Sequence, residues 1–209
     1  MNKNYLILAI VFSIFYNGCE KDKPNNTSQK NSTYELYGTY EMNGITSRLD
    51  WLGKKIAYGH NGTLMLKKGR IEAGSDGNIS GDFEIDMQTI NVTDLEGGRK
   101  NSLEGHLKAD DFFGVDKFPM AYIKFNFNKS KIINDAVEID ADLTIKNITH
   151  PVSFKATIVE HEPKLKIEAE IVFDRSKYDV RFGSGKFFQN LGDKLILDEV
   201  NVDAYLNFN

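Results

Sequence analysis

From about residue 34 onward, apolar and polar side chains alternate along several segments of the chain. In residues 137–145 (VEIDADLTI), every second residue is apolar, and the residues between them are acidic or threonine. The same alternation recurs in residues 79–87, 121–127, 152–158, 165–173 and 200–208. Because side chains of a strand point alternately to opposite faces, a period of two gives one apolar and one polar face. Each of these segments is therefore predicted to be a half-buried β-strand.

Short turn sequences separate the predicted strands, at residues 75–78 (SDGN), 134–135 (ND), 147–151 (NITHP) and 161–163 (HEP). Connections this short make neighbouring strands antiparallel. The polar face of each strand excludes a parallel α/β sheet, whose strands are apolar on both faces. A single antiparallel sheet can bury its apolar face by closing on itself. We predict an all-β fold, an extended antiparallel β-barrel of about eight strands, with a two-sheet sandwich as the alternative.

Residues 87–119 depart from the period of two. Asn101 and Glu104 have the spacing of a helix capping box, and leucines follow at helical spacing. This pattern predicts a short helix over about residues 102–111, near one opening of the barrel. Its last turn would contain Asp110 and Asp111, where acids oppose the helix dipole, so a nearby lysine is expected to compensate them.

His106 and Asp110 stand four residues apart, a spacing that could chelate a metal or pair an acid with a base. A metal site needs further ligands, and neither His60 nor His150 lies at a ligand spacing from this pair. The chain also contains no GxSxG elbow, P-loop or HExxH motif. We therefore expect His106, Asp110 and Asp111 to be structural, with no metal and no cofactor. The protein is expected not to be an enzyme, with a hydrolase or metal-dependent enzyme as the alternative.

The composition and net charge of the chain bear on its domain organisation and on whether it binds nucleic acid. The chain has 209 residues, of which 41% are hydrophobic, and this suits one domain with an appendage. Its formal net charge of −4 provides no basic footprint, so nucleic acid is not expected as a partner.

The appendage is at the N-terminus. Residues 1–18 contain an apolar run, too short to span a bilayer, that suits a signal peptide. Gly18 precedes Cys19, which is the only cysteine, and this arrangement resembles a bacterial lipobox. We therefore predict a lipoprotein signal peptide over residues 1–18 and a lipid anchor on Cys19. An ordinary signal peptide with an incidental cysteine is the alternative.

Residues 20–33 contain no large apolar side chain and cannot build a core. Residues 19–33 are therefore predicted to be the acylated cysteine and a flexible tether, and residues 34–209 the barrel domain. Taken together, the N-terminal features predict an exported, membrane-anchored lipoprotein of the bacterial envelope, either periplasmic or surface-exposed.

Between residues 38 and 207, a series of short motifs occurs in order: SRLDWLG (47–53), GHNGTL (59–64), GDFEIDM (81–87), GHLK (105–108), DFF (111–113), FP (118–119), LTIK (143–146), THPV (149–152) and FDRS (173–176). Their order and spacing resemble the YceI-like family of lipid- and polyisoprenoid-binding proteins. Residues 179–194 are longer than the corresponding loop of the simplest members. The resemblance implies a lipocalin-like barrel, a helix over one opening and an apolar tunnel for a long-chain lipid. It also implies export, no catalysis and, in some members, a homodimer.

The predicted ligand is an isoprenoid or fatty-acyl lipid, carried or sequestered in the envelope. Burial of each CH₂ group stabilises such a ligand by about 0.8 kcal/mol, so a tunnel wall needs no special motif. The candidate wall residues are Phe83, Ile85, Ile123, Phe125, Leu143, Ile145, Phe154, Ile171 and Phe173. We expect Leu143 and Phe154 to be neighbours across the predicted turn at 147–151. The alternative is a solid core in a surface adhesion or scaffold lipoprotein.

A polar head group would need its own contacts. The candidates are Arg175, Tyr178 and Arg181, in a segment that also contains Lys177 and Lys186. A guanidinium group suits a phosphate because it can donate two parallel hydrogen bonds. A solvated basic loop is the alternative interpretation.

Overall fold

The computed structural model describes residues 35–209, so the predicted signal peptide, Cys19 and the tether lie outside the described residues. The described chain contains nine strands, one α-helix and three short 3₁₀ helices. In chain order the elements are β1 (Gly38–Glu41), β2 (Arg48–Lys55), β3 (Gly59–Ala73), β4 (Asn78–Val92), α1 (Gly97–Lys108), β5 (Met120–Asn128), η1 (Lys129–Lys131), β6 (Ala136–Ile145), β7 (Ile148–Glu160), β8 (Lys166–Asp174), η2 (Arg175–Tyr178), η3 (Gly192–Lys194) and β9 (Ile196–Asn207).

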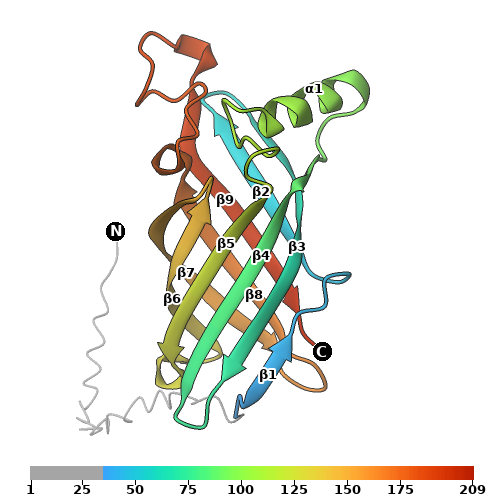
Figure 1. Ribbon diagram of the computed structural model, residues 1–209, viewed down its shortest axis with the longest axis vertical. Coiled ribbons are helices and arrows are strands. Elements are labelled where there is room, and N and C mark those ends of the chain that lie inside the picture. Colours follow the sequence, from blue (N-terminus) through green and yellow to red (C-terminus); the bar gives the residue numbers. More distant parts are fainter. Residues whose placement is uncertain (1–34) are drawn as a thin grey trace, which may run out of the picture.

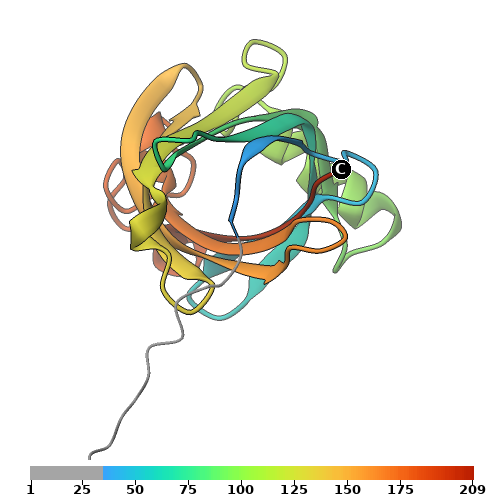
Figure 2. The ribbon, with the colours of Figure 1, turned by 90° about the horizontal axis from the view of Figure 1, so that it is seen from below.

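Strands β2 to β9 form a closed antiparallel barrel. Each strand pairs with the next along the chain, and β9 returns to pair with β2, so the predicted barrel is confirmed and the sandwich is excluded (Figure 1). Strand β1 pairs with the far half of β3, and Met42 bridges to Phe208 beyond the end of β9. Strand β2 thus pairs with the first half of β3, and β1 pairs with its second half, on the same edge of β3. Viewed along its axis, the sheet is a complete ring (Figure 2).

The interior follows from the alternation in the sequence. Along β6, the apolar side chains from Val137 to Ile145 are buried, and the acids Glu138, Asp140 and Asp142 are exposed. Closure hides the apolar face of every barrel strand from water without a second sheet, because all these faces point to a common centre. The hydrophobic core of the protein is therefore the lumen of the barrel.

The turn between β6 and β7 is shorter than predicted. Lys146 and Asn147 alone form it, with φ values of 51° and 61°, the geometry of a tight β-hairpin. Pro151 lies within β7, opposite Asp142, and the prediction that it belongs to the turn is wrong. Pairing between β7 and β8 begins only at Lys155, so β7 is unpaired on one side at Pro151. The proline therefore costs no hydrogen bond of the sheet.

The short turn also sets a register that differs from the expected one. Leu143 lies opposite His150, and Phe154 lies opposite Ile139, so Leu143 and Phe154 are not direct cross-strand neighbours. The expectation of that pair was wrong because it placed the turn over 147–151, whereas register follows from the length of the turn. Both side chains nevertheless point into the barrel, since an even shift in register preserves the face.

Helix α1 begins at Gly97, five residues before the predicted start near residue 102. Asn101 lies inside the helix rather than at its cap, so the predicted capping box is absent. The Glu104 carboxylate instead accepts the backbone N–H of Val92 (2.8 Å), which fastens the helix to the end of β4. No helix among residues 35–209 is long and apolar enough to cross a bilayer.

The C-terminal end of α1 also differs from the prediction. The helix ends at Lys108, and Asp110 and Asp111 lie beyond it. Its last turn contains His106 and Lys108, and a cation there complements the helix dipole. Lys117 compensates Asp110, with 2.6 Å between Nζ and Oδ2.

The two ends of the barrel are covered differently. Helix α1, residues 109–119 and the loop of residues 179–195 lie at one end, which we call the mouth (Figure 1). Strand β1 and the C-terminus lie at the other end, which we call the base, and residues 35–37 run across it (Figure 2). We refer to residues 179–195 as the mouth loop.

Candidate ligand-binding cavity

The inward side chains leave a cavity of about 180 Å³ inside the barrel. Its lining extends from Leu36 at the base to Leu107 and Phe112 at the mouth, and is almost entirely apolar. One buried water needs roughly 15 Å³ of such space and two to four polar partners. The cavity has ample room for water but few groups that could bind it, so it is suited to an apolar occupant.

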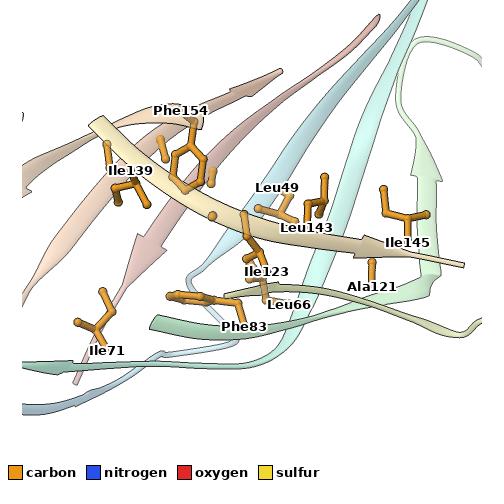
Figure 3. Packing of buried hydrophobic residues seen from close by; sticks show 14 of the residues in the cluster. Leu49, Leu66, Ile71, Phe83, Ala121, Ile123, Ile139, Leu143, Ile145 and Phe154 are labelled. Carbon is orange, nitrogen blue, oxygen red and sulfur yellow. The ribbon is translucent and has the colours of Figure 1, made fainter. Parts of the chain in front are cut away.

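All nine predicted wall residues lie on the lining of this cavity. Five are buried and come from β4 to β7: Phe83, Ile123, Leu143, Ile145 and Phe154 (Figure 3). The remaining four are partly buried and pack against the same core: Ile85, Phe125, Ile171 and Phe173. The structure therefore brings the nine residues together around one space, and their contact with a ligand stays a prediction.

Two of the aromatic wall residues lie against glycines on neighbouring strands. Phe125 is opposite Gly81, and a Cβ on that glycine would lie 2.2 Å from Cζ of the ring. Phe83 is opposite Gly69, where a Cβ would lie 2.4 Å from Cδ1. The rings thus occupy the space of a missing side chain and lie along the wall. These glycines have no recognisable motif, because their role depends on the cross-strand register.

The glycine contacts predict a specific effect of Gly81→Ala. The added methyl group must displace the Phe125 ring from the wall into the lumen, so we expect a destabilisation of about 1–3 kcal/mol and a smaller cavity. Gly53→Ala is the matched control, because Gly53 also lines the cavity and an added Cβ there meets nothing within 4 Å. Urea unfolding and mass spectrometry of bound lipid measure both effects. Equal behaviour of the two variants would contradict this account of the wall.

Trp51 is a lining residue that the sequence reasoning did not identify. Its indole lies over Gly62, where a Cβ would be 2.5 Å from Cζ2 of the ring. The indole Nε1 is buried and has no hydrogen-bond partner within residues 35–209. A buried donor without an acceptor costs free energy, so this N–H is an unsatisfied polar group of the protein interior.

Arg175 fastens the mouth loop. Its side chain is 1% exposed, and its three nitrogens donate to the backbone carbonyls of Val180, Phe182, Ile196 and Leu197. Nη2 also lies 3.3 Å from Oδ1 of Asp198. Burial lowers the pKa of Arg175, and the nearby Asp198 and Asp174 oppose this shift. The guanidinium is thus engaged by the protein itself, and a head group would have to displace these partners. A head-group role for Arg175 stays a prediction.

Tyr178 is also buried, at 1% exposed, and packs edge-on against His150 and Phe173. Its hydroxyl has no hydrogen-bond partner in the described part of the chain. Burial, with a smaller contribution from Asp174, raises the pKa of Tyr178 to about 12. The environment therefore favours the neutral phenol.

Tyr178→Phe is expected to change stability with pH in a defined direction. The raised pKa means that the native state keeps the phenol proton after the unfolded state has lost it. Its contribution to stability is therefore fully present below pH 10 and lost as pH rises toward 12. We expect Tyr178→Phe to alter the free energy of unfolding at neutral pH by less than about 1 kcal/mol. The variant should lose less stability than wild type between pH 9 and 12 in urea melts. If wild type and Tyr178→Phe lost the same amount of stability between pH 9 and 12, the raised pKa of Tyr178 would be contradicted.

Arg181 differs from the other two head-group candidates because it lies on the surface. Its Nε pairs with Asp179, two residues away on the mouth loop. The three head-group candidates thus have different surroundings. Arg175 is enclosed by backbone carbonyls, Tyr178 lies in the apolar core, and Arg181 faces solvent. A head-group role for Tyr178 and Arg181 stays a prediction.

His106, the histidine of the candidate cluster with Asp110 and Asp111, packs against aromatic rings at the end of α1. The His106 ring lies edge-on to Phe182 (4.2 Å between centroids) and Phe112 (5.8 Å). Nε2 of His106 is 3.9 Å from Oδ2 of Asp111, too far for a hydrogen bond. Asp110 pairs with Lys117 instead. This geometry joins the helix end to the mouth loop.

The other two histidines considered as partners are engaged elsewhere. His60 Nδ1 lies 2.8 Å from Oδ2 of Asp94, and His150 Nε2 lies 3.1 Å from the carbonyl oxygen of Lys177. Burial acts to raise the pKa of Asp94, but the donors His60 and Asn61 outweigh it, and the pKa is lowered. Within residues 35–209, no group of three or more His, Cys, Asp or Glu side chains is placed to hold a metal ion.

The closed barrel with an apolar lumen defines an all-β protein of the lipocalin-like class. The chain belongs to the YceI-like family, because the model of the YceI-like domain matches residues 40–208. No curated protein matches the sequence.

Solved structures of other proteins share this fold. BcnA of Burkholderia cenocepacia superposes with a TM-score of 0.62 at 16% identity, covering 79% of this chain and 98% of that chain. A polyisoprenoid binding domain from Saccharophagus degradans, implicated in plant cell wall breakdown, superposes with a TM-score of 0.59 at 14% identity, covering 81% and 97%.

Proposed function

We propose that this protein binds a long-chain amphiphilic lipid, a polyisoprenoid or a fatty-acid derivative, and carries or sequesters it in the bacterial envelope. The observation that carries the proposal is the apolar cavity, which reaches from Leu36 at the base to Leu107 at the mouth. A hydrocarbon chain in this space is stabilised by about 0.8 kcal/mol for each CH₂ group that leaves water. Membership of the YceI-like family and the fold shared with a polyisoprenoid binding domain support a lipid-binding role of the barrel.

The open volume also supports ligand binding over the filled-barrel scaffold that the sequence left as an alternative. A scaffold function requires no internal space, and natural interiors are close-packed with few voids larger than a water molecule. In this proposal the protein acts by binding, without a catalytic step.

Native mass spectrometry and lipid extraction test the proposal directly. Protein purified from an envelope fraction is expected to carry about one equivalent of a long-chain lipid, since the lining belongs to a single cavity. Protein stripped of lipid should take up an added polyprenyl or fatty-acid derivative and gain thermal stability, because a ligand of the native state alone raises the melting temperature. A wild-type protein that neither carries nor takes up such lipids would disprove the proposal.

We propose that Cys19 anchors the protein to a membrane of the envelope. Its place after Gly18, at the end of the apolar run, supports this. Lipid modification at the N-terminus of a bacterial lipoprotein supplies several acyl chains, above the two-signal threshold for stable attachment. Cys19→Ala should move the protein from the membrane fraction to the soluble fraction on cell fractionation. A variant that remains with the membranes would show that another feature holds the protein there.

A further inference from the structure

Exposed apolar side chains gather at the mouth of the barrel. They are 39–67% exposed and come from the β2–β3 turn, the mouth loop and the start of β9: Ile56, Tyr58, Phe182, Phe187, Phe188 and Leu197. Lys55 pairs with Ile196, which places the β2–β3 turn beside the end of the mouth loop. In Figure 1, both segments project beyond the strands at the end that carries α1. We call residues 54–58 and 179–198 the mouth rim.

The tip of the mouth loop is held in place by the folded core. The backbone N–H groups of Phe187 and Phe188 donate to the carbonyl of Ser184 at 3.2 and 3.0 Å. Ser184 is fully buried, and its hydroxyl donates to Asp198 (2.9 Å), which also pairs with Arg175. The two phenylalanines are thus presented to solvent on a fixed support, although burial elsewhere would stabilise them.

Apolar surface continues from the rim into the barrel. Leu197 is 39% exposed and also lines the cavity, and its neighbour Ile196 lines the cavity as well. A molecule that enters or leaves at this edge would remain in contact with apolar atoms. Large apolar side chains exposed beside one another mark an interaction site, and their continuity with the apolar lining of the barrel favours a lipid phase as the partner.

The charge of the rim agrees with this partner. The mouth rim contains five basic and three acidic side chains, a net of +2, on a chain whose net charge is −4. Arg181 and Lys186 pair with aspartates, and Lys54 and Lys194 have no acidic partner among residues 35–209. Apolar tips flanked by lysines are typical of segments that lie in the interface of an anionic membrane.

We propose that the mouth rim docks the barrel on the surface of an anionic lipid bilayer. The Phe187–Phe188 tip enters the head-group region, Lys54 and Lys194 face lipid phosphates, and the mouth opens toward the membrane. This contact is separate from an anchor at Cys19. It does not require that the cavity carry lipid, so the docking and the carriage can be tested independently.

Vesicle flotation tests the docking. The barrel closes within residues 35–209 around its own core, so a chain that starts at Glu20 contains the folded unit and lacks both the apolar leader and Cys19. This protein is mixed with vesicles of phosphatidylcholine or of equimolar phosphatidylcholine and phosphatidylglycerol. We expect it to float with the phosphatidylglycerol vesicles and to be released by salt, which screens exposed charges.

Three double variants locate the contact. Phe187→Ser with Phe188→Ser should weaken flotation by at least about tenfold, because two large apolar side chains leave the interface. Lys54→Gln with Lys194→Gln should weaken binding to phosphatidylglycerol vesicles by about fivefold for each lysine. The control is Tyr37→Ser with Ile133→Ser, which changes side chains of similar or greater exposure at the base and should bind as wild type does.

Circular dichroism melts of every variant verify folding, and mass spectrometry of the same samples reports lipid in the cavity. Weaker flotation of the folded Phe187→Ser, Phe188→Ser variant with unchanged lipid content supports docking by the rim. If the wild-type protein floats with neither kind of vesicle, the proposal is wrong, and the rim would instead contact another protein. A control variant that loses flotation as strongly as the rim variants also overturns it.

Discussion

Arg175→Met is expected to lower the free energy of unfolding by about 3–5 kcal/mol, the range observed when one partner of a buried ion pair is removed. Methionine fills much of the same space, but it cannot donate to the four carbonyls that the guanidinium holds. Asp198 also loses its cation. Because these carbonyls belong to the mouth loop and the start of β9, the loop should become susceptible to proteolysis before the barrel unfolds.

Arg181→Met is the matched control. This arginine lies six residues further along the chain, on the mouth loop itself. It is exposed, and its contacts are the ion pair with Asp179 and the face of the Phe187 ring (5.2 Å from Cζ to the centroid). A surface pair of this kind contributes about 1 kcal/mol or less, so the variant should melt close to wild type. Urea unfolding followed by circular dichroism, with limited proteolysis, measures both variants. If both variants lost a similar amount of free energy of unfolding, Arg175 would not be the residue that holds the mouth loop in place.

Leu143→Gln is expected to leave a folded protein that copurifies with far less lipid. Leu143 is 5% exposed and lines the cavity near the mouth end of β6, and Figure 3 shows it among the other inward side chains. A buried amide without a partner costs about 1–3 kcal/mol, which a barrel with open internal space can accommodate. The same amide meets a bound lipid directly, so occupancy should fall much more than stability. Phe154→Gln provides a second position on the same wall.

The control for the wall is Asp142→Gln, one residue away on the outer face of β6. It should leave both the melt and the lipid content unchanged, since the side chain is exposed on the outer face of the barrel. Unfolding of Leu143→Gln and Phe154→Gln, in a protein whose wild type never carries lipid, would point to a solid core, because a close-packed interior cannot accept a misfit polar group. Melts and lipid mass spectrometry together distinguish these outcomes.

Much of the candidate site could be read from the alternation of residues. The period of two determines which face a side chain occupies, whatever strand it pairs with. For this reason Leu143 and Phe154 point into the lumen as predicted, even though their expected pairing was wrong. The acidic residues between the apolar positions of β6 likewise indicated that one face of the strand is exposed to solvent. This pattern favoured an antiparallel sheet that closes on itself.

Contacts between distant segments needed the tertiary structure. The packing of Phe125 on Gly81 depends on the register of β4 and β5, and no local pattern specifies it. Arg175 had the sequence character of a phosphate ligand, yet its fork meets carbonyls up to 22 residues further along the chain. Helix α1 begins at Gly97, before the capping signal at Asn101, and Glu104 accepts a hydrogen bond from Val92 of a neighbouring strand in place of one at the helix cap.

The sequence by itself determined the faces of the strands, the apolar character of the lumen and the family. Closure of the barrel between β2 and β9, the space left inside it and the joining of the mouth rim were decided only in three dimensions. The physical reason is that alternation is a local property of the backbone, fixed by the direction of each side chain along its own strand. Register, packing volume and the partners of buried polar groups are instead set by segments that meet only when the sheet closes.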